Sequence, residues 1–160
     1  MTELELTEDQ REAVAESEFA ICVADFYGDL ATRLANRAVE AFAEAGVSPA
    51  SVHEYRVAGA FELPLAARLA AETGRFAGVA CLGAVIRGET SHYDHVCAEA
   101  ARGIQEVALT TGVPCAFGVI TADDMDQALA RAGGDKRDQG RDAAHAVMRS
   151  AALARELAPD

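Results

Sequence analysis

Residues 83–92 read GAVIRGETSH and mark the point at which a strand gives way to a helix. The apolar run 79–86 is typical of a buried strand, and a helical pattern begins near Ser91 after a glycine turn. Backbone N–H groups at a helix start are unpaired and, together with the helix dipole, attract an anion. Thr90 and Ser91 add hydroxyl donors, and His92 is well suited to proton transfer near neutral pH. The stretch therefore predicts an anion site beside an acid–base group.

Apolar strand-like runs alternate with alanine-rich helical runs along the rest of the chain. The strand candidates are 19–24, 52–57, 79–86 and 115–121. The helix candidates are 29–45, 62–73, 91–111, 123–132 and 138–157. This alternation is typical of an α/β domain whose parallel sheet is covered on both faces. Gly46, Gly74 and Gly112 follow three of the helices, where C-terminal caps are expected.

Composition and charge exclude several classes of protein. The chain has 160 residues and a formal net charge of −12, which argues against a nucleic-acid partner because duplex binding needs a basic face. No apolar stretch is long enough to span a membrane, and the acidic start 1–5 differs from a signal peptide, so we expect a cytoplasmic protein. The four cysteines lack a Cys-x-x-Cys spacing and lie in apolar surroundings, which predicts reduced thiols.

Ligands of open parallel sheets bind beyond the carboxyl ends of the strands. Four segments lie at or just beyond such ends: Phe26, Phe61-Glu62, 87–92 and Thr121. We therefore expect these segments to converge on one rim of the sheet.

Three motifs resemble the lumazine synthase family of riboflavin biosynthesis. The stretch 83–92 closely resembles the family signature, and residues 58–64, AGAFELP, resemble its Pro-Gly-Ala-Phe-Glu segment. Residues 117–121, FGVIT, with the later Gln127-Ala128 and Arg131-Ala132-Gly133, resemble the C-terminal half of the family. In order and spacing the resemblance runs from about Phe19 to about Leu153. With the alternating pattern, it predicts one domain over residues 1–160, a three-layer α/β/α sandwich with a four-stranded, mostly parallel, flavodoxin-like sheet.

The resemblance also implies an activity. It is the condensation of 5-amino-6-(D-ribitylamino)uracil with 3,4-dihydroxy-2-butanone 4-phosphate to 6,7-dimethyl-8-ribityllumazine, phosphate and water. No cofactor is needed, and the implied partners are these small molecules and further copies of the chain. The family forms pentamers, and some members close pentamers into an icosahedral shell.

The resemblance assigns roles to individual residues. It makes His92 the proton donor. It places the pyrimidine and its ribityl chain against Phe26, Ala60, Phe61, Glu62, Ala84, Val85, Ile86 and Phe117. The phosphate site we expect comprises Arg87, Gly88, Glu89, Thr90, Arg131 and Lys136. The resemblance further implies that Phe117 and Arg131 reach into the site of a neighbouring subunit.

The residues alone leave plainer interpretations open. Phe26 and Phe117 would by default be core aromatics. Glu62 would be a first-turn partner of the helix dipole, and Arg131 a solvated cation at a helix end. His92 and His95 lie three residues apart near Cys97, but without a carboxylate ligand in a matching motif we expect no metal site.

Three departures from the family pattern bear on function. Tyr27 stands where the family usually has Asn, and Ala58 replaces a proline. Asp138-Gln139-Gly140 stands where Asn-Lys-Gly is common, so a lysine on the phosphate side is missing and Lys136 or Arg137 would have to reach in. These departures motivate an alternative, a catalytically weak paralogue that binds flavin or lumazine as a carrier or shell protein. A flavodoxin-like electron carrier ranks last, because residues 25–29 lack a phosphate loop rich in Ser and Thr.

The sequence also bears on assembly. In the resembling family the N-terminal segment, here 1–18, pairs with a neighbouring subunit's sheet, and Leu4-Glu5-Leu6 is the candidate strand. Residues 131–140 carry no insertion relative to shell-forming members, so the sequence does not exclude assembly into a shell. The negative charge, repeated around a closed surface, argues for lone pentamers or salt-dependent closure.

Overall fold

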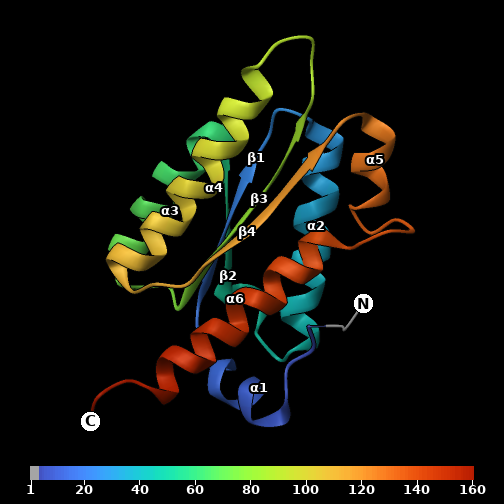
Figure 1. Cartoon of the computed structure of the whole chain (residues 1–160). Coiled ribbons are helices and arrows are strands. Elements are labelled where there is room, and N and C mark those ends of the chain that lie inside the picture. Colours follow the sequence, from blue (N-terminus) through green and yellow to red (C-terminus); the bar gives the residue numbers. More distant parts are fainter. Residues whose placement is uncertain (1–3) are drawn as a thin grey trace.

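The computed structural model describes residues 4–160 and has three layers, with a sheet between two layers of helices (Figure 1). The strands are β1 Phe19–Ala24, β2 Val52–Val57, β3 Gly78–Ile86 and β4 Cys115–Ala122. They lie in the order β2-β1-β3-β4, and each pair of neighbours is parallel. The predicted α/β/α sandwich with a four-stranded sheet is confirmed, and the sheet is parallel throughout.

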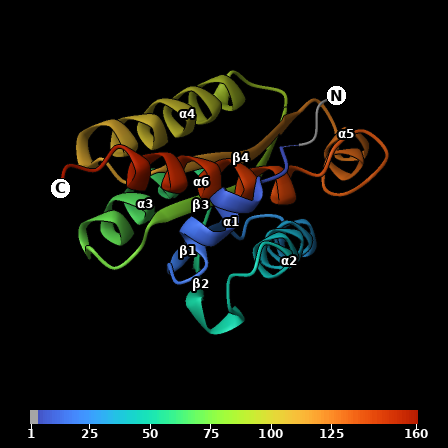
Figure 2. The same cartoon turned by 90° about the horizontal axis from the view of Figure 1, so that it is seen from below.

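The helices divide between the two faces of the sheet. One face is covered by α3 Leu63–Glu72 and α4 His92–Thr111, and the other by α2 Gly28–Glu44 and α6 Gln139–Glu156 (Figure 2). The short helices are α1 Glu8–Val14, which packs against α6, and α5 Met125–Ala130, which follows β4. Two 3-10 turns, η1 Pro49–Ser51 and η2 Ala60–Glu62, precede β2 and α3. Within residues 4–160 no helix has the length and apolar character to cross a membrane.

The apolar strand runs are explained by burial on both faces of the sheet. Every residue of β1 is buried. Ile21 and Val23 pack into the cluster under α2 and α6, whereas Ala20 and Cys22 pack into the cluster under α3 and α4. A strand between two helical layers must be apolar at every position, because neither face meets water.

The expected glycine caps are confirmed. Gly46, Gly74 and Gly112 follow α2, α3 and α4 with φ angles of 93°, 69° and 73°. These angles lie in the left-handed region, where a residue with a Cβ is disfavoured. The caps end the helices and turn the chain back toward the next strand.

Most predicted elements shift by no more than one residue at either end, and the structure differs further from the sequence prediction in three places. Helix α1 was not predicted, although Thr7 and Gln10 form a capping box at its start. The last short helix is α5, shorter than the expected 123–132, because the Asp124 side chain accepts from the Gln127 N–H at 2.8 Å and starts it late. Residues 4–7 have no regular structure, although Leu6 is buried. The strand at Leu4–Leu6 stays a prediction that needs a neighbouring sheet, and residues 1–3 of the predicted N-terminal segment lie outside the described residues.

A close contact between α2 and α6 leads to a stability prediction. A Cβ at Gly140 would overlap the backbone carbonyl of Leu34, which cannot move as a flexible side chain can. Gly140→Ala is therefore expected to lower the free energy of unfolding by about 1–3 kcal/mol, the usual range for overpacking. Urea unfolding at fixed protein concentration measures this change.

Gly28→Ala is the matched control. Gly28 is likewise at the start of a helix, but a Cβ there would meet nothing within 4 Å. Its unfolding midpoint should be unchanged or slightly higher, because alanine favours the helix. Equal midpoints for the two variants would contradict the close approach of α2 and α6.

Candidate active site

A cavity of about 590 Å³ opens beyond the carboxyl ends of β1 and β3, between η2 and the first turns of α4. Its volume lies in the range of pockets for small organic ligands. The predicted residues that line it are Phe26, Ala60, Phe61, Glu62, Ala84, Val85, Ile86, Gly88, Thr90 and His92. All four expected segments lie at the same rim, because Thr121 of β4 pairs with Val85 of β3, but Thr121 itself does not line the cavity.

Two exposed aromatic rings form part of the wall. Phe26 follows β1 and has 73% of its surface exposed, and Phe61 in η2 has 60% exposed. Phe26 meets Tyr27 edge-on, with 4.9 Å between the ring centroids. Because neither phenylalanine belongs to the core, their faces are available to an aromatic ligand.

The floor of the cavity is the end of β3. The strand is buried from Gly78 to Ala84 and becomes half-buried at Val85 and Ile86, where it emerges from between the helical layers. Alternate side chains of a strand point to opposite faces, so this emerging end offers apolar side chains and backbone edges together. A flat heterocycle fits such a surface.

Glu62 is the carboxylate of the cavity. It precedes α3 but makes no capping hydrogen bond to that helix, so it does not act as a capping residue. Its Oε2 lies 3.3 Å from the Cβ position of Gly59, another residue of the cavity wall. A carboxylate in this place can accept hydrogen bonds from ligand hydroxyl groups.

The connection from β3 to α4 is the segment for which the sequence predicts an anion site. Helix α4 begins at His92, and Ser91 precedes it without a side-chain cap. Within residues 4–160 the backbone N–H groups of residues 88–91 donate to no protein acceptor, and only the His92 N–H is paired, to Thr90 Oγ1 at 3.3 Å. The free donors and the dipole of the long helix α4 favour an anion next to the His92 side chain.

Arg87 has contacts that differ from those expected of a phosphate ligand. Its guanidinium carbon lies 4.3 Å from the Tyr93 ring centroid, and its Nε donates to Asp123 Oδ1 at 2.9 Å. Its Nη1 lies 3.6 Å from Asp94 Oδ1. The hydrogen bond with Asp123, followed by the nearby carboxylates, raises the pKa of Arg87. Arg87 therefore ties the end of β3 to α4 and to the residue after β4, and it does not line the cavity.

The remaining predicted residues lie apart from the cavity. Phe117 is on edge strand β4 and is 39% exposed, and its carbonyl oxygen accepts from Gln139 Nε2 at 3.3 Å. Arg131 follows α5 and donates from Nη1 to the Gln127 carbonyl at 2.9 Å. We call Phe117, Arg131, Gln139 and the exposed Lys136 the β4–α6 group. Glu89 is exposed and also does not line the cavity.

The structure adds residues to the cavity that the sequence did not single out as ligands. They are Tyr27, Ala58, Gly59, Tyr93, His95 and Val96. His95 and Val96 lie one helical turn after His92, a spacing that places them on the same face of α4 and could have indicated them. Within residues 4–160 no cluster of three His, Cys, Asp or Glu side chains could hold a metal ion.

Comparison with known proteins identifies similar sequences. The sequence model of the family described as 6,7-dimethyl-8-ribityllumazine synthase matches residues 16–155. A relative from Syntrophus aciditrophicus (strain SB), named 6,7-dimethyl-8-ribityllumazine synthase, is 44% identical over 139 residues. These residues cover 87% of this chain and 90% of the relative. The family match includes both the cavity and the β4–α6 group.

The exposed ring of Phe26 leads to a binding prediction. Phe26→Ala is expected to weaken binding of 5-amino-6-(D-ribitylamino)uracil by about threefold to tenfold, because the stacking surface is lost. Calorimetric titration measures the affinity. Leu109→Ala, which truncates a side chain of 74% exposure at the far end of α4, is the control and should bind as the unmodified chain does. Equal affinities for the two variants would remove Phe26 from the site.

Proposed function

The chain belongs to the 6,7-dimethyl-8-ribityllumazine synthase family, and we propose that the cavity beyond β1 and β3 is the main part of its active site. It is a transferase of riboflavin biosynthesis that condenses 5-amino-6-(D-ribitylamino)uracil with 3,4-dihydroxy-2-butanone 4-phosphate. One observation carries the assignment of the site: a single cavity combines exposed aromatic rings, a carboxylate, free backbone donors and His92. Each of these features matches a part of the two substrates.

The pyrimidine substrate fits the part of the cavity between Phe26 and the end of β3. Its ring stacks on Phe26 and lies along Val85 and Ile86. Its ribityl hydroxyls reach the carboxylate of Glu62, which accepts hydrogen bonds from them. The phosphate of the second substrate binds the free N–H groups of residues 88–91. This arrangement brings the amine of one substrate next to the ketone of the other.

The chemistry needs orientation and repeated proton transfer. The amine attacks the ketone, water leaves to form an imine, phosphate is eliminated, and ring closure releases a second water. Holding both substrates in place contributes about 7–11 kcal/mol to lowering the barrier. His92, beside the phosphate turn, transfers protons in these steps and adds about 10²–10⁴-fold.

Two exposed apolar surfaces support a ring of subunits. The first, the α3 stripe, consists of Phe61, Leu65 and Leu69, and the second, the edge patch, consists of Phe117, Met125 and Leu129. Helices α3 and α5 lie on opposite sides of the molecule in both views (Figures 1 and 2). Contact between two different surfaces repeats from subunit to subunit and closes a ring when the rotation fits.

A ring would complete the active site. The α3 stripe begins at Phe61 in the cavity wall, and the edge patch includes Phe117 of the β4–α6 group. Contact between the two surfaces would carry Phe117 and Arg131 to a neighbour's cavity, where the guanidinium can hold the phosphate by two hydrogen bonds. The proposal therefore comprises a shared site, a pentamer as the minimum assembly, and the expected cytoplasmic location.

His92→Ala tests the proton-transfer role. The turnover rate is expected to fall by about one to three orders of magnitude, with both substrates still bound, because binding depends on other residues. Formation of lumazine, followed by fluorescence across the pH range, gives the rate. The fold should persist because His92 is exposed. An unchanged rate at every pH would exclude His92 from the mechanism.

Lys136 and Gln139 test the phosphate side. Gln139 leaves this side without the family's lysine, and we expect Lys136→Ala to raise KM for the butanone phosphate about threefold to tenfold, as loss of a phosphate contact would. Gln139→Lys in the same chain should restore KM. If Lys136→Ala is silent and Gln139→Lys alone lowers KM, the site lacks a cation and a weakened enzyme is favoured.

The assembly is tested by analytical ultracentrifugation at low and high salt. We expect pentamers at low salt, and any larger shell to form only as salt screens the net charge of −12. Leu129→Glu in the edge patch should dissociate the ring and abolish activity together. A stable and active monomer at any salt concentration would contradict the shared site.

A further inference from the structure

The residues from Arg131 to Gln139, which we call the 131–139 loop, form a closed unit between α5 and α6. The Gln139 N–H donates to the Arg131 carbonyl at 2.9 Å, and Ala132 and Asp138 form an antiparallel bridge. The Lys136 N–H donates to the last residue of α5 at 3.0 Å. These bonds fix the shape of the loop and join it to α5, and the fully buried Ala132 anchors one side of it in the core under α2 and α6.

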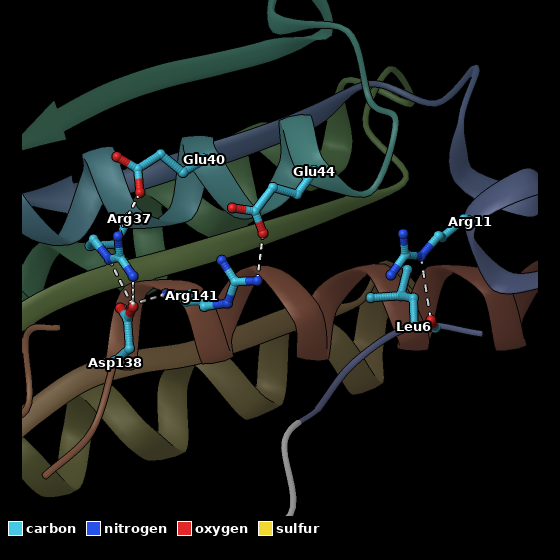
Figure 3. Close-up of polar contacts among 7 residues, drawn as sticks. All are labelled: Leu6, Arg11, Arg37, Glu40, Glu44, Asp138 and Arg141. Carbon is cyan, nitrogen blue, oxygen red and sulfur yellow. Dashed lines mark hydrogen bonds and ion pairs between the residues drawn. The ribbon is translucent and has the colours of Figure 1, made fainter. Parts of the chain in front are cut away.

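A side chain of α2 holds the other side of the loop, at Asp138. Arg37 donates from Nε and Nη2 to Asp138 Oδ2 at 2.7 and 2.5 Å (Figure 3). Its Nη1 donates to Glu40 Oε2 at 2.7 Å, which orients the guanidinium from its own helix. The Cβ position of Gly133 lies 3.3 Å from Arg37 Nε, so the guanidinium lies directly beneath the loop. Arg37 therefore bonds to the loop at Asp138 and lies next to it at Gly133.

The contact between Arg37 and Asp138 also neutralises the charge of the Asp138 carboxylate. The Asp138 side chain is only 18% exposed and is next to Gln139 in the β4–α6 group. Without a cation from α2, this carboxylate would attract the loop's own cations and repel a phosphate nearby. Paired with Arg37, it keeps its role as the N-terminal cap of α6, where it accepts from the Arg141 N–H.

We propose that Arg37 is a positioning residue for the phosphate-bearing substrate. Through Asp138 it helps to hold the 131–139 loop in place and neutralises a half-buried carboxylate of that loop, so that Arg131 and Lys136 reach the phosphate in a neighbour's cavity. The inference rests on the proposed function, in which this loop provides those two cations. It assigns to α2 a part in substrate recognition, although no residue of Gly28–Glu44 lines the cavity.

A second ion pair between the same helices provides a matched control. Arg141 of α6 donates from Nη2 to Glu44 Oε2 of α2 at 2.5 Å (Figure 3). Among residues 4–160 its guanidinium makes no hydrogen bond or ion pair with the loop, and the Arg141 contact with Asp138 comes from the backbone N–H, which methionine keeps. Both arginines are partly exposed, so removal of either should leave the fold intact. Only the loss of Arg37 should affect the loop.

The experiment compares steady-state kinetics of Arg37→Met, Arg37→Lys, Asp138→Asn and Arg141→Met in the assembled protein. Arg37→Met should raise KM for the butanone phosphate about tenfold, as loss of orientation does, with KM for the pyrimidine changed less than about twofold. Arg37→Lys, which keeps the charge, should recover part of the loss. Asp138→Asn keeps the helix cap. In the double variant with Arg37→Met, KM for the butanone phosphate should rise by less than the product of the two separate rises. Arg141→Met should change neither KM.

Three results would overturn the inference. The first is an unchanged KM for the butanone phosphate in Arg37→Met. The second is an equal rise of the KM values for both substrates in Arg37→Met. The third is an equal rise of KM for the butanone phosphate in Arg37→Met and in the Arg141→Met control. Arg131→Ala, measured in parallel, separates the two levels of the argument. If Arg131→Ala weakens the phosphate substrate but Arg37→Met does not, the inference alone fails. If Arg131→Ala is silent, the assignment of the loop to the phosphate fails, and the inference fails with it.

Discussion

The pairing of β1 with β3 at the centre of the sheet sets the position of everything in the cavity. The two strands are in register from Phe19 and Gly78 to Val23 and Leu82, and both are buried between the helical layers. Because the strands are parallel, they end at the same rim, where Phe26 follows one and the 88–91 turn follows the other. The aromatic ring, the unpaired N–H groups of the 88–91 turn and His92 come together as a consequence of this register.

Local patterns predicted these elements well because the determining interactions are local. Strands buried on both faces are continuously apolar, glycine caps require a left-handed backbone, and a helix start after a strand offers free donors. The ten expected ligands that line the cavity, from Phe26 to His92, were assigned mainly by resemblance to the family, and they lie together because their segments follow neighbouring strands. The Thr7 and Gln10 capping box shows that a local signal was also present for α1, where no helix was predicted.

Contacts between distant segments could not be predicted in this way. Arg37 and Asp138 are separated by 101 positions, and no periodicity relates them. Arg87 was expected to bind phosphate from its place beside the turn. Its guanidinium instead stacks over the Tyr93 ring and donates a hydrogen bond to Asp123, which only the β3–β4 pairing brings near. The separation of Phe117 and Arg131 from the cavity likewise depends on the whole sheet, and their expected roles concern a second subunit.

The central claim is that each active site needs two subunits, and mixed oligomers test it most directly. Subunits carrying His92→Ala keep Arg131, and subunits carrying Arg131→Ala keep His92. The two impaired proteins are mixed in equal amounts and coassembled at random. If the site is shared, about a quarter of the contacts between neighbours then combine an intact His92 with an intact Arg131. The account predicts lumazine formation at about a quarter of the unmodified rate from the mixture. Activity no greater than the sum of the two separate proteins would contradict it.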